Sequence, residues 1–107
     1  MSSEQYRGDS WAFLVTANDA NKKPLDLTGA SLEWKLANTS GADVLTLTRD
    51  HGIDVLDDLK GRLVINVDKT ATVNFVAGEY LHQLRVTTAQ AQISTQFKSY
   101  ITVLDPL

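Results

Sequence analysis

The sequence predicts an all-β domain in which two antiparallel sheets pack face to face. Seven or eight short apolar runs are separated by turn signals every eight to fifteen residues. Within most runs, apolar and polar side chains alternate, as in a strand buried on one side. No long amphipathic helix interrupts them. We therefore expect an antiparallel β-sandwich of the immunoglobulin-like type with seven or eight strands, and a small barrel as the alternative.

Length and composition fit a single β-sandwich domain spanning residues 1–107. Hydrophobic residues make up 43% of the chain and charged residues 21%, a balance that permits a core and argues against disorder. The chain has no cysteine, which excludes a disulfide framework and a thiol nucleophile. Residues 1–5 are polar, and we expect them to be disordered.

Charge and hydropathy argue against several kinds of partner. The formal net charge of −3 disfavours nucleic acid and anionic membranes. Residues 1–10 lack the apolar core of a signal peptide. No apolar run approaches the roughly 20 residues of a membrane-spanning helix. We expect a soluble protein made in a cytoplasm, with no signal peptide and no nucleic-acid or membrane partner.

The first expected strand places Trp11 and Phe13 on one face. Its other face is not clearly polar, so the strand is covered on both sides or lies in an interface. A turn rich in Asn, Asp and Pro follows at residues 18–24. A second turn contains Asp26, whose carboxylate can accept from local backbone N–H groups, and Gly29, which can adopt the turn angle.

The cleanest alternation lies around Trp34, where apolar residues at 32, 34 and 36 alternate with polar residues at 31, 33 and 35. A turn at 38–41 leads to a strand over 44–48 with the spacing of a hairpin. A short strand over 53–55 and a longer one over 62–67 follow further turns.

Residues 68–76 are the one segment that the pattern does not predict to be extended. Asp68 can cap a helical turn, Ala71 and Phe75 have helical spacing, and Gly78 would end the turn. We expect one short helical turn here; the alternative is a loop that drops Phe75 into the core.

The strand over 78–86 is the one around which the others are organised. It begins at Gly78 and places Tyr80 and Leu84 on its buried face. A final run over 93–103 is long for one strand, so Ser99 is expected to mark a bulge or bend. Six residues are expected to form the structural core: Trp11, Phe13, Trp34, Phe75, Tyr80 and Leu84.

No set of residues predicts chemistry. His82 shares the buried parity of Tyr80, which favours a partly buried histidine bonded to a neighbour, and His51 lies in a turn. Acidic residues gather between 43 and 58 without the spacing of a calcium loop. The chain has no nucleophile elbow, catalytic triad, phosphate-binding glycine loop or zinc-ligand set. We expect no enzymatic activity, cofactor or metal.

Two motifs that could bind a ligand have structural explanations. The Arg-Gly-Asp tripeptide at 7–9 is read by some cell-surface receptors, but here it abuts a strand. Trp11 and Trp34 could form a sugar-stacking platform, but on alternating strand positions they are more often core residues. Three apolar residues that alternation does not explain are candidates for an interface, unless a loop or helical turn of the same chain covers them: Leu14, Val64 and Leu81.

One succession of motifs resembles a known family. Arg-Gly-Asp-Ser-Trp at 7–11 leads into an apolar strand, and Pro-Leu-Asp-Leu-Thr-Gly-Ala at 24–30 leads into Leu-Glu-Trp at 32–34. Gly-Ile at 52–53, Gly-Arg-Leu at 61–63 and Ala-Gly-Glu-Tyr at 77–80 follow. Over residues 6–103 this is similar to the small immunoglobulin-like domains of tailed-phage and prophage structural proteins, in particular the N-terminal domain of upper baseplate proteins.

The resemblance implies a non-catalytic assembly module in the tail, baseplate or fibre region of a virion or of its assembly intermediate. Its partners would be neighbouring tail components and copies of itself, with a trimer as the expected homo-oligomer. The chain lacks the long helical extension that carries the next component in the baseplate proteins, so a receptor-binding role does not transfer. The alternative is a free-standing immunoglobulin-like domain that binds carbohydrate or a cell-surface ligand through Trp11 or loop residues.

Overall fold

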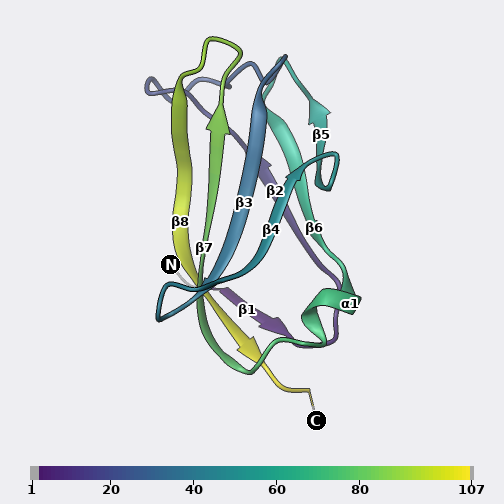
Figure 1. Ribbon diagram of the computed structural model, residues 1–107. Helices are drawn as coiled ribbons and strands as arrows, with labels where there is room; N and C mark the ends of the chain where they lie inside the picture. Colours follow the sequence, from purple (N-terminus) through teal and green to yellow (C-terminus); the bar gives the residue numbers. More distant parts are fainter. Residues whose placement is uncertain (1–2, 107) are drawn as a thin grey trace.

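The computed structural model describes residues 3–106, which form eight strands and one short helix (Figure 1). The strands are β1 (Ser3–Tyr6), β2 (Trp11–Thr16), β3 (Ser31–Asn38), β4 (Asp43–Arg49), β5 (Gly52–Asp57), β6 (Arg62–Val67), β7 (Gly78–Thr87) and β8 (Ile93–Leu104). The helix is α1 (Lys69–Thr72). The predicted all-β fold with one short helical turn is confirmed.

The strands follow the order β1-β8-β7-β3-β4-β5-β6-β2. The contact between β4 and β5 consists of two residue pairs, Thr48–Gly52 and Arg49–Ile53. At this point the array turns over, so that β5, β6 and β2 form a second layer behind β8, β7, β3 and β4 (Figure 1). Pairing is antiparallel except between β4 and β5 and between β1 and β8.

This arrangement is the immunoglobulin topology. Strands β2, β6 and β5 take the places of B, E and D, and β3, β7 and β8 take those of C, F and G. Two further hallmarks are present. Trp34 is fully buried on the C-type strand, and the Tyr80 hydroxyl, near the start of the F-type strand, donates to the Val76 carbonyl oxygen at 2.5 Å. The sandwich is therefore immunoglobulin-like.

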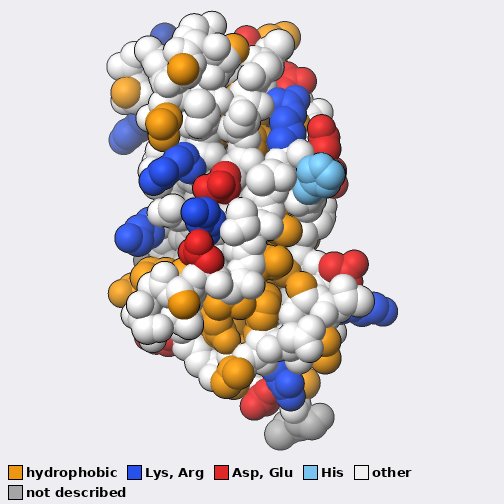
Figure 2. Space-filling view, in the orientation of Figure 1, with side chains coloured by type: hydrophobic (Ala, Val, Ile, Leu, Met, Phe, Trp, Pro, Cys, Tyr) orange, Lys and Arg blue, Asp and Glu red, His pale blue; other side chains and the backbone are white. Residues whose placement is uncertain are grey.

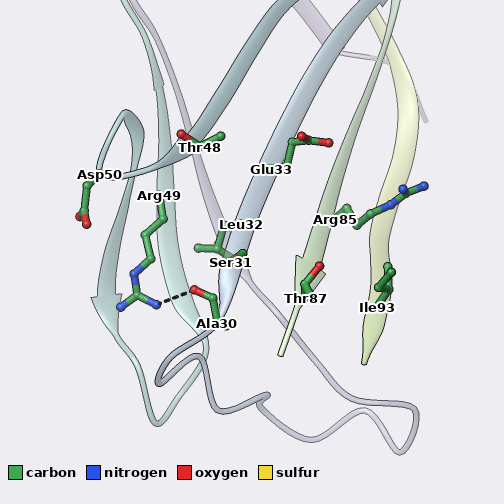
Figure 3. A pocket seen from close by; sticks show the side chains of 10 residues that line it. All are labelled: Ala30, Ser31, Leu32, Glu33, Thr48, Arg49, Asp50, Arg85, Thr87 and Ile93. Atoms are coloured by element: carbon green, nitrogen blue, oxygen red, sulfur yellow. Dashed lines mark hydrogen bonds between the residues drawn. The ribbon is translucent and has the colours of Figure 1, made fainter. Parts of the chain in front are cut away.

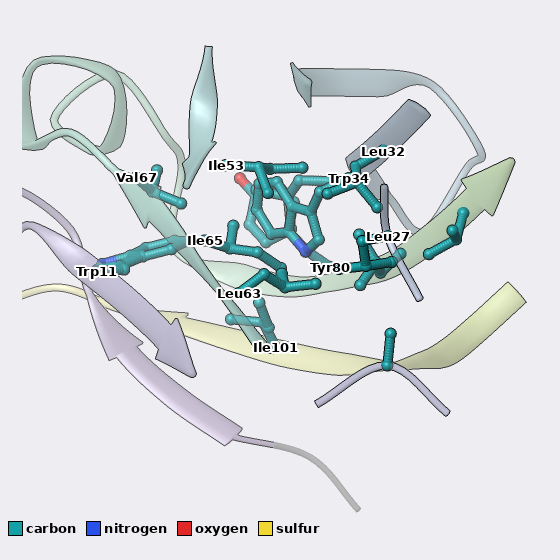
Figure 4. Packing of buried hydrophobic residues seen from close by; sticks show 14 of the residues in the cluster. Trp11, Leu27, Leu32, Trp34, Ile53, Leu63, Ile65, Val67, Tyr80 and Ile101 are labelled. Atoms are coloured by element: carbon teal, nitrogen blue, oxygen red, sulfur yellow. The ribbon is translucent and has the colours of Figure 1, made fainter. Parts of the chain in front are cut away.

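The core lies between the two layers (Figure 4). Trp34 is wholly buried and Tyr80 is 7% exposed, so the two rings predicted to be central are inside. Of the other predicted core residues, Trp11, Phe75 and Leu84 are buried, whereas Phe13 is only half-buried. The predicted core residues are mostly aromatic, whereas aliphatic side chains form most of the observed core, among them Leu27, Leu32, Leu36, Ile53, Leu63, Ile65, Val67, Val86, Ile101 and Val103.

Helix α1 forms where the sequence predicts it. The Asp68 carboxylate accepts from the Thr70 backbone N–H at 2.9 Å, and this bond lowers the pKa of Asp68. The helix also anchors the Arg-Gly-Asp corner between β1 and β2. The hydroxyl of the buried Thr72 donates to the Asp9 carbonyl oxygen at 2.7 Å and accepts from the Gly8 N–H at 3.1 Å. The tripeptide is therefore part of a structural joint.

The prediction that residues 1–5 are disordered is wrong for Ser3, Glu4 and Gln5, which belong to β1; Met1 and Ser2 lie outside the described residues. Strand β1 pairs in parallel with residues 101–104 of β8. Backbone bonds to the far end of the chain hold it, and its side chains are exposed or half-buried. Such a strand leaves no hydrophobic pattern in its own sequence.

The bulge expected at Ser99 lies three residues earlier. Leu84 is opposite Phe97 while Arg85 is opposite Thr95, so Gln96 is the extra residue in β8. Because of this extra residue, the side chains of β8 before Gln96 point to the opposite face from the one that simple alternation along the run predicts. As a result Ile93 is 65% exposed, although simple alternation would put it on the same face as the buried Ile101 and Val103.

Two tight turns hold the loops against the sandwich. In the 26–30 loop, the Asp26 carboxylate accepts from the Thr28 N–H at 2.9 Å, and Gly29 has a φ of 71°. Gly61 has a φ of 65°, and a Cβ there would lie 2.5 Å from the Ala17 carbonyl oxygen. Only glycine fits this second position without displacing backbone.

Candidate interaction surface

The terminal strand β2 is the most unusual surface feature of the domain. It pairs antiparallel with β6 along one side, and no strand among residues 3–106 pairs with its other side. In an antiparallel strand every second residue directs its N–H and C=O to the same side. Half of the backbone polar groups of β2 are therefore open to another strand.

The side chains of β2 do not protect this open edge. Its six residues, Trp-Ala-Phe-Leu-Val-Thr, include no charged residue, proline or glycine. Natural sheets usually blunt such an edge with a charge, a proline, a bulge or a very short strand. The other terminal strand, β1, follows this rule, since it has four residues and contains Glu4. Strand β2 therefore has the composition of a strand that is paired.

On the outer face of this layer, Leu14 is 78% exposed. Its cross-strand partner on β6 is Val64, which is half-buried. The structure thus brings together two of the three residues predicted to form an interface. It places the third, Leu81, on the outer face of β7 in the opposite layer. Alternation identified these side chains but could not assign them to a layer.

On the inner face, β2 borders an open seam of the sandwich. Phe13 and Val15 point toward the core but are only half-buried, as is Phe97 on β8. A hollow of about 390 Å³ lies between the end of β2 and the start of β8. Gln96 spans its upper end by accepting from the Asn18 N–H at 2.9 Å and donating to the Asn18 carbonyl oxygen at 3.1 Å. These half-buried side chains were not predicted as surface residues, because the sequence does not reveal which strand is terminal.

A polar cluster lies just inside this seam. His82 is 7% exposed, and its Nδ1 accepts from the Trp34 indole N–H at 3.1 Å. This bond assigns the ring proton to Nε2, which lies 2.9 Å from the Ser99 hydroxyl oxygen. Phe13 and Phe97 pack on the imidazole with ring-centroid distances of 5.6 and 4.9 Å. Burial in these apolar surroundings lowers the pKa of His82 to about 4, so the ring is neutral at pH 7.

A larger hollow, of about 560 Å³, opens at the start of β3 beside Glu33, Thr48 and Arg85 (Figure 3). The Arg49 guanidinium on its wall is already engaged. It donates to the carbonyl oxygens of Leu27 and Ala30 at 2.7 and 3.3 Å and to the Asp58 carboxylate at 2.7 Å. This arginine holds the 26–30 loop to the sandwich. The Arg49 guanidinium is therefore already used within the fold and is not a free group for a ligand in this hollow.

The outer face of β8, β7, β3 and β4 is mixed in character (Figure 2). Basic and acidic side chains are interspersed across its middle (Figure 2). On β3, the Lys35 ammonium lies 3.6 Å from the Glu33 carboxylate and 3.8 Å from that of Asp43. Hydrophobic side chains gather in its lower part (Figure 2). Val44 and Val76 line a hollow of about 450 Å³ beside Tyr80. Among residues 3–106, β4 pairs over 43–47 with β3 alone, so it too has an open side, but unlike β2 it begins with a charged residue, Asp43.

Within residues 3–106, no group of three or more His, Cys, Asp or Glu side chains is arranged to hold a metal ion. In the same part of the chain, no helix is long and apolar enough to cross a membrane.

Trp11 is 2% exposed, and its indole N–H donates to the Tyr6 carbonyl oxygen at 2.9 Å. The stacking platform considered for Trp11 and Trp34 is therefore not formed, because both rings are inside the fold.

No family model and no curated protein matches the sequence. Among solved structures, the chain is similar to CopC from Methylosinus trichosporium OB3b, with 16% identity, 89% of this chain and 95% of that chain covered, and a TM-score of 0.46. It is also similar to AggA, the major subunit of aggregative adherence fimbriae type I from Escherichia coli, with 19% identity, 96% and 89% covered, and a TM-score of 0.47. Likenesses of this strength carry no argument about function.

Proposed function

We propose that this chain is a non-catalytic structural module that assembles with other protein chains through the open edge of β2. The single observation that supports the proposal is an uncharged six-residue terminal strand that places a 78% exposed leucine beside a half-buried valine. An open edge supplies backbone groups for pairing, and apolar side chains beside it stabilise the contact by burial.

The setting that we propose is the tail, baseplate or fibre region of a tailed-phage or prophage particle, or its assembly intermediate. Support comes from the resemblance of residues 6–103 to immunoglobulin-like domains of such proteins. The motifs that carry the resemblance form joints of the sandwich: the 7–11 segment is the corner tied to α1, and the 26–30 loop is held by Arg49. They account for a shared framework rather than for a ligand site.

One form of the alternative, a carbohydrate-binding domain that uses Trp11, has no observation in its favour. The Trp11 ring is buried, and its N–H is bonded to the backbone. A sugar-stacking ring must present a free face. We therefore do not propose this function.

Two measurements test the proposed function together. Native mass spectrometry of the purified chain is expected to show a stable homo-oligomer, and antibody labelling of intact particles from an induced host is expected to mark the tail region. A chain that stays monomeric at every concentration and is absent from particles would refute the proposal. Turnover in a broad hydrolase screen would contradict its non-catalytic part.

A further inference from the structure

We propose that β2 pairs in antiparallel orientation with β2 of a second copy of this chain, about a two-fold axis that passes through Leu14. The inference rests on the proposed function, specifies its partner and geometry, and replaces the expected trimer with a two-fold dimer. Two three-stranded layers, β5-β6-β2, would join into one continuous six-stranded sheet. An isologous contact of this kind uses the same surface on both copies.

The backbone pattern restricts the register. The Ala17 N–H, next in line after β2, donates to the Gly61 carbonyl oxygen on the β6 side at 2.8 Å. Because direction alternates along a strand, the odd-numbered residues of β2 face β6, and Ala12, Leu14 and Thr16 present their N–H and C=O groups at the open edge. A two-fold axis at Leu14 pairs it with Leu14 of the second copy, and pairs Ala12 with Thr16.

Outer-face side chains complement one another in this register. Leu14 lies directly opposite Val64 on β6. One apolar row then crosses the axis. It consists, in order, of Val64 and Leu14 of one copy followed by Leu14 and Val64 of the other. A shift of two residues would place Leu14 opposite Ala12 or Thr16 and leave much of its side chain in water. The Leu14-centred register therefore buries the most apolar surface on this face.

Inner-face side chains are complementary as well. The same register places Phe13 opposite Val15 of the second copy, and Val15 opposite Phe13. Both side chains are half-buried in the single chain because β2 has no neighbour on their open side. The second copy supplies that neighbour, so one strand pairing covers apolar groups on both faces.

Charges do not oppose the contact. Asp54, on β5, lies opposite Val64 on β6 and is therefore at the end of the central row. Its carboxylate accepts from the Asn66 side-chain amide at 3.1 Å. The two copies of Asp54 are five strand spacings apart, roughly 24 Å, beyond the range of exposed charges in physiological salt. Arg62 shares a row with Ala12 and Asn66 of the second copy, neither of which is charged.

A cysteine substitution tests the geometry directly, because the chain has no cysteine of its own. Leu14→Cys would place two thiols on residues about 5.5 Å apart between Cα atoms, within the range that a disulfide spans. We expect Leu14→Cys to form a covalent dimer under mild oxidation several-fold faster than the control Val76→Cys. The control is matched in exposure, 77% against 78%, and lies outside the strands, in the loop between α1 and β7.

A second pair of variants tests the energetics. Leu14→Lys places two like charges at the centre of the contact and is expected to shift the native mass from dimer to monomer, whereas Val76→Lys leaves the mass unchanged. Both positions are exposed, so the fold is retained, as the fluorescence of the buried Trp11 and Trp34 will report.

The outcomes separate this inference from the proposed function. A wild-type dimer that cross-links through residue 14 supports both. An oligomer that cross-links no faster at 14 than at 76, or that survives Leu14→Lys, overturns the pairing of β2 with β2 of a second copy, while assembly of the chain with other protein chains stands. A monomer that is nevertheless labelled in particles also overturns the inference and leaves the structural role intact. A monomer that is absent from particles refutes both.

Discussion

Acidification should weaken the fold chiefly through one side chain, His82. The Nδ1 atom of this imidazole accepts from Trp34 and its ring is packed between two phenylalanines, so the folded protein holds it neutral. Protonation would place a donor against the indole N–H and a charge in the core. Burial accordingly lowers the pKa of His82 from 6.5 to about 4.

The magnitude follows from linkage. Between pH 6.5 and 4 the unfolded chain binds a proton at His82 and the folded chain does not, so the free energy of unfolding falls as the pH falls. The contribution is fully present above pH 6.5. At pH 5 it is reduced by about 2 kcal/mol, and below pH 4 the loss levels off at about 3 kcal/mol.

Urea unfolding followed by tryptophan fluorescence at pH 7.5 and at pH 5 measures this difference. His82→Gln removes the titrating ring and is expected to lose most of the pH dependence, although it is less stable at pH 7.5. His51→Gln, a change at an exposed histidine in the turn after β4, serves as the matched control and should keep the wild-type dependence. Equal pH dependence in wild type and His82→Gln, or an NMR titration of His82 near 6.5, would refute the reasoning.

Three further substitutions test single contacts by the same unfolding assay. Tyr80→Phe removes the hydroxyl that both donates to and accepts from the Val76 backbone and should cost about 1–2 kcal/mol; an unchanged midpoint would show that the corner is not stabilising. Gly61→Ala should cost at least about 2 kcal/mol, because its Cβ would overlap backbone oxygens at a positive φ. Gly41→Ala, at a positive φ in open space, separates the two effects and should lose only about 1 kcal/mol. Asp68→Ala removes the helix cap and should cost about 1 kcal/mol; full stability without it would contradict the capping role.

Much of the fold could be predicted from the sequence because most strands bury one face. Trp34 and Tyr80 alternate with polar neighbours, and that period alone identifies β3 and β7 as strands whose inward side chains form the core. Helix α1 was predictable for a local reason, since Asp68 caps its own helix two residues away. Strand β1 was not, because its partner lies about a hundred residues further along the chain.

The interaction surface was only partly predictable. Leu14 and Val64 attracted notice because alternation does not explain them, and the structure makes them neighbours. Leu81 has the same signal but lies in the other layer. Phe13 has the pattern of a core residue and is half-buried only because β2 is terminal. Strand order depends on tertiary pairing, which a single sequence does not encode locally.

The parallel pairing of β1 with β8 has a consequence for the order of folding during synthesis. Ser3 pairs with Ile101 and Tyr6 with Leu104, so the first strand stays without its partner until the last has left the ribosome. The ion pair between Arg7 and Asp105, 2.6 Å apart, likewise cannot form until residue 105 has left the ribosome. The layer of β5, β6 and β2 can pair much earlier, and its uncharged edge would be exposed on nascent chains while β1 waits. Neighbouring chains on one polysome could therefore meet through β2 before either has closed its sandwich.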